Sequence, residues 1–202
     1  MNGEVIRENR RSGMADSNLT KRALAAALKE LMNEQPFVKI SVGDICERCE
    51  MNRKSFYYHF KDKYDLINWI FDTEFISFAR KQGYTIVDNF LVDLCHYFYE
   101  NRGFYQKVLA IQGQDCFANH FKEVLIPLVN SQLQAVVPSD QTQEIYNFQV
   151  AFLTDAAVGT LQRWISEKDC IPPEKFLSML RSCIQMMAIK VCNDLEEQQQ
   201  TQ

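Results

Sequence analysis

A cluster of aromatic rings flanked by positive charges stands out in this 202-residue chain. The cluster reads FYYHF over residues 56–60, between Arg53 and Lys54 on one side and Lys61 and Lys63 on the other. A core segment would not carry these charges, because charged side chains are almost never buried without partners. Tyrosine hydroxyls, a ring N–H and basic groups together suit phosphate oxygens. These residue types therefore indicate binding to a nucleic-acid backbone.

Three short helices are expected to position this cluster. The first runs from Asp16 or Ser17 to about Asn33, with apolar residues at helical spacing, and Pro36 cannot continue it. Ser41 and Asp44 form a capping-box pattern that opens a second helix over about 42–49.

A three-residue turn separates that helix from the next. Asn52 can cap a third helix over about 53–60, and Asp62 a fourth over 63–81. Two helices joined by so short a turn predict a helix-turn-helix, whose second helix leads into the major groove with its N-terminal residues. Phe56 and Phe60 lie four apart, so they share a face that can pack on the other helices.

The remaining side chains of this motif are predicted to contact DNA. Arg53 and Lys54 are expected at base edges, with Ser55 and Tyr57 beside them, and Lys63 at a phosphate near a helix N-terminus. The full predicted set is Ser41, Val42, Gly43, Asn52, Arg53, Lys54, Ser55, Tyr57, Tyr58, His59, Lys61 and Lys63.

The rest of the chain also reads as helices, so the expected fold class is all-α. Further helices are placed near 85–101, 104–112, 118–136, 141–168 and 173–195. The expected division is a flexible tail (1–16), the DNA-binding domain (17–62), a helical regulatory and dimerisation domain (63–196) and a second flexible tail (197–202).

The charge distribution and the cysteines indicate in which compartment the protein works. Residues 1–62 hold 11 Lys+Arg and 9 Asp+Glu, whereas the rest holds 11 and 17, so the front is weakly basic and the back acidic. The 7 cysteines are scattered, and no apolar run approaches a membrane span or a signal peptide. We expect a cytoplasmic protein with free thiols and no membrane partner.

Catalytic and metal chemistry have little support in the sequence. Cys46 and Cys49 would need two more ligands to hold zinc, so ordinary packing is the expected role of both. His96 and His120 are isolated and are expected to be partly buried with partners. No pairing of a nucleophile with a base is visible. We expect neither an enzyme nor a cofactor.

The predicted 141–168 helix carries two apolar faces, one for the domain core and one for a second subunit. The predicted dimer interface comprises Phe152, Ala156, Gly159, Phe176, Leu180, Cys183 and Met187. A ligand cavity is a weaker expectation, because the same aromatic residues could equally fill a core: Phe75, Phe78, Tyr97, Tyr105, Phe117 and Trp164.

Residues 18–70 resemble the DNA-binding domain of the TetR/AcrR family of bacterial transcription regulators. The most specific piece is FYYHFKDKYDL, with Tyr57, Phe60, Lys63 and Leu66 on the family's spacing. The resemblance implies an all-helical homodimer with a C-terminal regulatory domain. Glu50 departs from the family's usual glycine in the turn, and a left-handed residue there costs roughly 1 kcal/mol. Lys54 departs from a usually small residue.

Residues 157–180 further resemble a C-terminal domain of TetR-like regulators from Gram-positive bacteria, among them activators of dihydroxyacetone-kinase operons, which bind a protein co-activator. The expected function is a repressor that binds double-stranded operator DNA and is released by a small-molecule or protein effector. The alternatives are an activator, or a helical interaction module controlled by a protein partner, with weak or lost DNA binding.

Overall fold

The computed structural model describes residues 2–84, 87–113, 116–136, 141–183 and 185, although the side chains of 2–16, 87, 88 and 136 are not described. The described residues form helices without any strand, as the sequence predicted. None of the helices in these ranges is long and apolar enough to cross a membrane.

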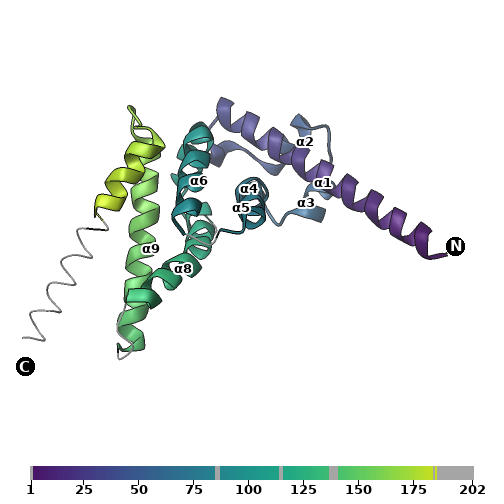
Figure 1. Cartoon of the computed structure of the whole chain (residues 1–202). Helices are drawn as coiled ribbons and strands as arrows, with labels where there is room; N and C mark the ends of the chain where they lie inside the picture. Colours follow the sequence, from purple (N-terminus) through teal and green to yellow (C-terminus); the bar gives the residue numbers. More distant parts are fainter. Residues whose placement is uncertain (1, 85–86, 114–115, 137–140, 184, 186–202) are drawn as a thin grey trace, which may run out of the picture.

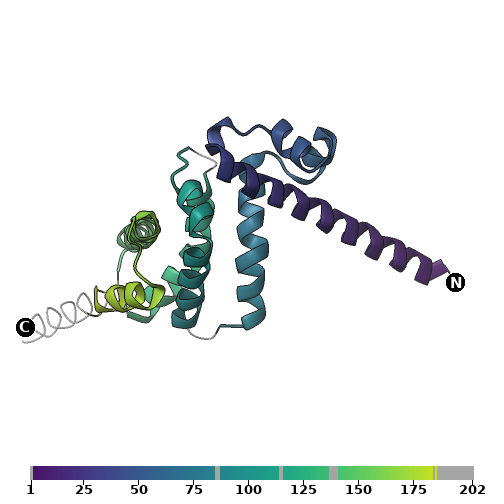
Figure 2. The ribbon, with the colours of Figure 1, turned by 90° about the horizontal axis from the view of Figure 1, so that it is seen from above.

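The N-terminal helices form one end of the molecule (Figure 1). α1 (Asn2–Glu34) is followed by the short turn η1 (Phe37–Lys39), α2 (Val42–Arg48) and α3 (Arg53–His59). α1 begins earlier than the expected Asp16 or Ser17, and its N-terminal part projects away from the body in both views (Figure 2). Residues 2–16 contain no proline and several helix-favouring residues, so nothing in the chain interrupts the helix before residue 17.

Local caps set the ends of the short helices where the sequence placed them. The Ser41 side chain accepts from the backbone N–H of Asp44, and the Asp44 carboxylate accepts from the backbone N–H of Ser41. The Asn52 side chain caps α3, and Asp62 accepts from two backbone N–H groups at the start of α4 (Lys63–Phe71). These caps satisfy N–H groups that a helix leaves without partners.

One continuous helical segment joins the two parts of the molecule. α4 passes through a π-helical turn, η2 (Asp72–Ile76), into α5 (Ser77–Gln82), so the predicted helix over 63–81 is present with an irregular turn at its middle. Single π-turns inside α-helices are frequent at functional sites.

The C-terminal helices pack around the far end of that segment. They are α6 (Val87–Glu100), α7 (Arg102–Leu109), α8 (Phe117–Val136), α9 (Gln143–Ser166) and a helix over 173–183. α9 and the 173–183 helix form the end opposite α2 and α3 (Figures 1 and 2). One hydrophobic core extends from Leu24 in α1 to Leu177. The predicted C-terminal tail, 197–202, lies outside the described residues.

Candidate nucleic-acid interface

Two buried rings fix the recognition helix α3 on the helices behind it. Phe56 and Phe60 are 0% and 3% exposed, as their shared face predicted, and their ring centroids lie 5.7 Å apart. At the N-terminus of α3, the Asn52 side chain accepts from the backbone N–H of Ser55 at 2.9 Å. Because both the face and the start of α3 are held, its outward side is presented in one orientation.

The outward side of α3 combines positive charge with exposed rings. Tyr57 and Tyr58 are 59% and 82% exposed, and Arg53, Lys54 and Lys61 are exposed around them. Neighbouring exposed rings mark interaction surfaces more often than isolated ones do. Together they offer hydroxyl, ammonium and guanidinium donors along a single helix, which suits phosphates and base edges.

The start of α2 lies beside the start of α3 because Gly43 has no side chain. A Cβ built on Gly43 would come within 2.5 Å of a terminal nitrogen of Arg53. The Arg53 guanidinium therefore rests against the first turn of α2. Of the other residues predicted there, Ser41 serves as the cap and Val42 packs partly against the core. The α2 contribution to any contact is thus made mainly by backbone and by the Ser41 hydroxyl.

Three predicted contact residues have structural partners of their own. Asn52 and Ser55 hydrogen-bond to each other within the cap of α3. His59 is half-buried, and its ring meets that of Tyr58 edge-on at 4.8 Å. Burial, and then the nearby charge of Lys21, lower the pKa of His59, so the ring is neutral at pH 7 and can still donate one N–H.

Lys63 differs from its predicted role as a simple phosphate contact. Its ammonium donates to the backbone carbonyls of Phe37 at 2.9 Å and Ile40 at 2.7 Å, and it lies 4.3 Å from the centre of the Phe37 ring. Two of its three protons are therefore used to tie the start of α4 to the segment that precedes α2. The sequence could not show this, because the carbonyls belong to residues more than twenty positions away.

The exposed stripe on α9 fits the second apolar face expected from the sequence. Phe148 and Phe152 are 70% and 59% exposed, and Ile145, Ala156 and Gly159 continue the stripe at helical spacing. No heavy atom lies within 4 Å of a Cβ built on Gly159, which leaves room for a neighbouring helix.

The predicted interface needs correction in the helix over 173–183. Phe176 is buried, and its ring stacks on Trp164 at 4.2 Å, so it belongs to the core. Leu180 is half-buried and Cys183 is exposed, whereas Met187 lies outside the described residues. Met179, which the sequence analysis did not single out, is 54% exposed on this helix.

The predicted aromatic ligand cavity is instead mostly packed core. Phe75, Tyr105, Phe117 and Trp164 are 0–3% exposed, Tyr97 packs against the same core, and Phe78 points to the surface. Phe71, at the end of α4, contacts many of these rings. The alternative that the aromatics fill the core is the one the structure supports.

His120, Cys46 and Cys49 behave as the sequence suggested. His120 is half-buried and paired with Asp72 at 2.9 Å, and Asp72 raises the pKa of His120. Cys46 is buried, and the Cys49 thiol beside it donates to the carbonyl of Ile45.

Residues that the sequence analysis missed connect the two parts of the molecule. The Lys29 ammonium of α1 reaches Glu74 in η2 at 2.6 Å, and the Lys107 ammonium of α7 donates to the carbonyl of Met32 at 2.6 Å. Their only sequence signal is a lysine at the edge of an apolar helical pattern, which many surface lysines share.

The fold and the exposed side of α3 define a helix-turn-helix protein with a helical C-terminal domain. A family model for the bacterial regulatory proteins of the tetR family matches residues 23–70, and one for a transcriptional regulator C-terminal region matches residues 87–186. The chain belongs to the TetR family.

A curated relative is similar in sequence over about half of the chain. It is the HTH-type dhaKLM operon transcriptional activator DhaS of Lactococcus lactis, 34% identical over 99 residues. The match takes in 48% of this chain and 53% of that protein, so the chain spans about half the length of the curated relative.

Solved structures share the fold over most of the chain. The dihydroxyacetone kinase operon activator DhaS has a TM-score of 0.60 at 24% identity, covering 85% of this chain and 97% of that one. A TetR transcriptional regulator from Streptococcus agalactiae has a TM-score of 0.64 at 21% identity, covering 84% and 98%.

Proposed function

We propose that this protein is a dimeric, sequence-specific DNA-binding regulator of transcription that works in the cytoplasm. The observation that carries the proposal is the outward side of α3. This helix is held by its buried rings and its cap, and it exposes Arg53, Lys54, Tyr57 and Tyr58. Arg53 and Lys54 are assigned to base edges, and Tyr57, Tyr58 and Lys61 to the phosphates on either side of the groove.

A second copy of the chain supplies the second recognition helix. The stripe of Ile145, Phe148, Phe152, Ala156 and Gly159 is apolar and exposed in the single chain, which supports its assignment to the subunit interface. A two-fold dimer reads two half-sites about 34–36 Å apart, or a multiple of that distance.

Repression by occluding a promoter is the direction we propose, with an effector bound by the C-terminal domain that releases the DNA. The lysine links from α1 to Glu74 and from α7 to Met32 give such an effector a route to the DNA-binding helices.

Activation is the second candidate, because the curated relative carries the name of an operon activator. A protein effector belongs to the same alternative. Transcription from the promoter upstream of the protein's own gene, measured with purified polymerase with and without the protein, distinguishes repression from activation.

DNA binding itself is tested by fluorescence anisotropy on the fragment selected by the protein from random DNA. Lys54→Ala should weaken binding to that fragment by ~1–3 kcal/mol and to random DNA by less, as for a base contact. Lys81→Ala, an exposed lysine on α5, is the matched control and should leave both affinities unchanged. An equal loss on both DNAs would reassign Lys54 to the backbone, and no salt-dependent binding at all would refute the proposed function.

A further inference from the structure

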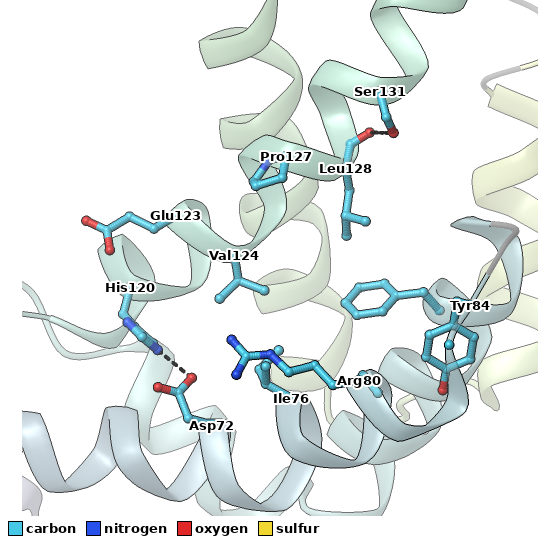
Figure 3. A pocket seen from close by; sticks show the side chains of 13 residues that line it. Asp72, Ile76, Arg80, Tyr84, His120, Glu123, Val124, Pro127, Leu128 and Ser131 are labelled. Carbon is cyan, nitrogen blue, oxygen red and sulfur yellow. Dashed lines mark hydrogen bonds and ion pairs between the residues drawn. The ribbon is translucent and has the colours of Figure 1, made fainter.

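A cleft of about 740 Å³ opens between the helical segment η2–α5 and α8 (Figure 3). None of the six residues predicted to line a ligand cavity lines it. Its wall is apolar on both sides, with Ile76 and Ala79 facing Val124, Pro127 and Leu128. The volume is in the range of sites for small organic molecules.

A single guanidinium occupies the middle of this apolar cleft. Arg80 extends from α5 so that its guanidinium lies between Ile76 and Val124 (Figure 3). Within the part of the chain that the structure describes, Arg80 forms no ion pair. A guanidinium carries five donors in a planar fork that matches a carboxylate or a phosphate.

The other charged groups of the cleft are already engaged or lie at its rim. Asp72 is paired with His120 at 2.9 Å, and the Glu123 carboxylate points away from the centre (Figure 3). Among the side chains that the structure describes, a cationic ligand would therefore meet Arg80 at the centre without a free carboxylate beside it. A neutral ligand would cover the guanidinium and leave its charge without a counter-ion, which is costly.

We propose that this cleft binds a small amphipathic anion, a carboxylate or phosphate on an apolar body. The anionic group pairs with Arg80, and the body packs between Ile76, Val124 and Leu128. The assignment of this ligand as the effector of DNA binding rests on the proposed function, whereas the binding itself does not.

Occupation of the cleft reaches the DNA-binding domain through the π-helical turn. Asp72 and Ile76 belong to η2 and line the cleft, and Glu74 of the same turn binds Lys29 of α1 at 2.6 Å. Glu74 also accepts from the Tyr97 hydroxyl at 3.0 Å, which ties the turn to α6. A ligand that shifts this turn therefore shifts the anchor of α1.

The direct test titrates the ¹⁵N-labelled full-length protein, without DNA, with octanoate, octyl phosphate, octanol and octylamine below their micellar concentrations. We expect the two anions to bind about tenfold more tightly than octanol, as for a charge-assisted hydrogen bond, and octylamine to bind more weakly still. The shifted amides should belong to residues around Ile76 and Val124.

Arg80→Gln should abolish the preference for the anions, whereas Lys81→Gln, an exposed neighbour outside the cleft, should keep it. Octylamine binding as tightly as octanoate, a preference that survives Arg80→Gln, or no binding of any probe would each overturn the proposal. If the protein binds anions through Arg80 but fails to bind DNA, the proposed function is contradicted and the anion site is not.

Discussion

Single basic residues of the N-terminal domain divide into two groups. Arg53 and Lys54 lie at the surface of α3 and Lys61 is exposed just after its end, whereas Lys63 is turned inward onto two carbonyls. Burial lowers the pKa of Lys63, and the charge of Asp44 partly opposes that effect. The positive charges near the FYYHF cluster therefore have separate roles, one in architecture and the others at the surface.

Lys63→Ala should lower the free energy of unfolding, because two carbonyls lose a charged donor. A loss of ~1–2 kcal/mol is expected for partly exposed hydrogen bonds of this kind, measured by urea unfolding. Lys39→Ala, an exposed lysine in the adjoining turn, should have no effect. Unchanged stability combined with a salt slope of DNA binding shallower by about one unit would instead restore Lys63 as a phosphate contact.

The ion pair between His120 and Asp72 should make stability depend on pH. The raised pKa means that folding favours protonated His120, so the stabilisation is complete below the ordinary pKa of about 6.5 and is lost as pH rises through the folded value. Because the Asp72 side chain is 46% exposed, the effect should stay below ~1 kcal/mol.

Urea unfolding at pH 5.5 and 8.5 checks this with His120→Gln as the reference. These pH values lie about one unit below and two units above the ordinary pKa of histidine. Between them the original protein should lose more stability than the variant. Equal losses of stability in the two proteins would show that the ion pair contributes nothing to the pH dependence.

At the scale of elements, the turn between α2 and α3 holds the one non-glycine residue with a positive φ among the residues that the structure describes. Glu50 adopts a left-handed conformation with φ of 54°, as its place in the motif predicted. The backbone N–H groups of Glu50 and Met51 bond to the carbonyls of Glu47 and Cys46, which closes the end of α2. The hydrogen bonds hold a conformation that a side chain disfavours.

Glu50→Gly should stabilise the protein by ~0.5–1 kcal/mol, because relief of the left-handed strain exceeds the added entropy of the unfolded chain. The midpoint of urea unfolding measures this gain. Glu50→Ala removes the same charge and keeps the strain, so it should show little of the gain. A variant with alanine as stable as the one with glycine would assign the effect to charge instead.

For the whole molecule, coupling between the ends depends on one shared core and a few long-range contacts. The Tyr97 and Tyr105 hydroxyls meet at 2.7 Å beside Glu74, which also holds Lys29. α1 is thereby joined to α6 and α7 through the π-turn. These contacts are the route that we propose for an effector's influence on the DNA-binding helices.

Gly159→Arg should convert the protein to monomers, since an unpaired charge in a close helix contact costs ~3–5 kcal/mol. Space around Gly159 in the single chain lets the variant fold. Sedimentation velocity measures the mass of the variant. Its operator affinity should also fall, because a monomer contacts only one half-site. Phe78→Arg, on the exposed side of α5, should remain dimeric. A dimeric Gly159→Arg protein with full affinity would place the interface elsewhere.

Features that depend on neighbouring residues could be predicted from the sequence. Capping by Ser41, Asn52 and Asp62, the strained Glu50 and the buried faces of short helices all follow from contacts within a few positions. Such contacts depend on the spacing of nearby residues, so they could be predicted along with the helix-turn-helix.

Contacts between groups far apart in the sequence became known only from the folded chain. Lys63 meets the carbonyls of Phe37 and Ile40, and Phe176 stacks on Trp164 instead of facing a partner. The cleft around Arg80 exists because α5 and α8 lie side by side. A helical pattern shows that a face is apolar but not which surface covers it, because many pairings of apolar faces bury similar areas and only packing of the whole chain selects one.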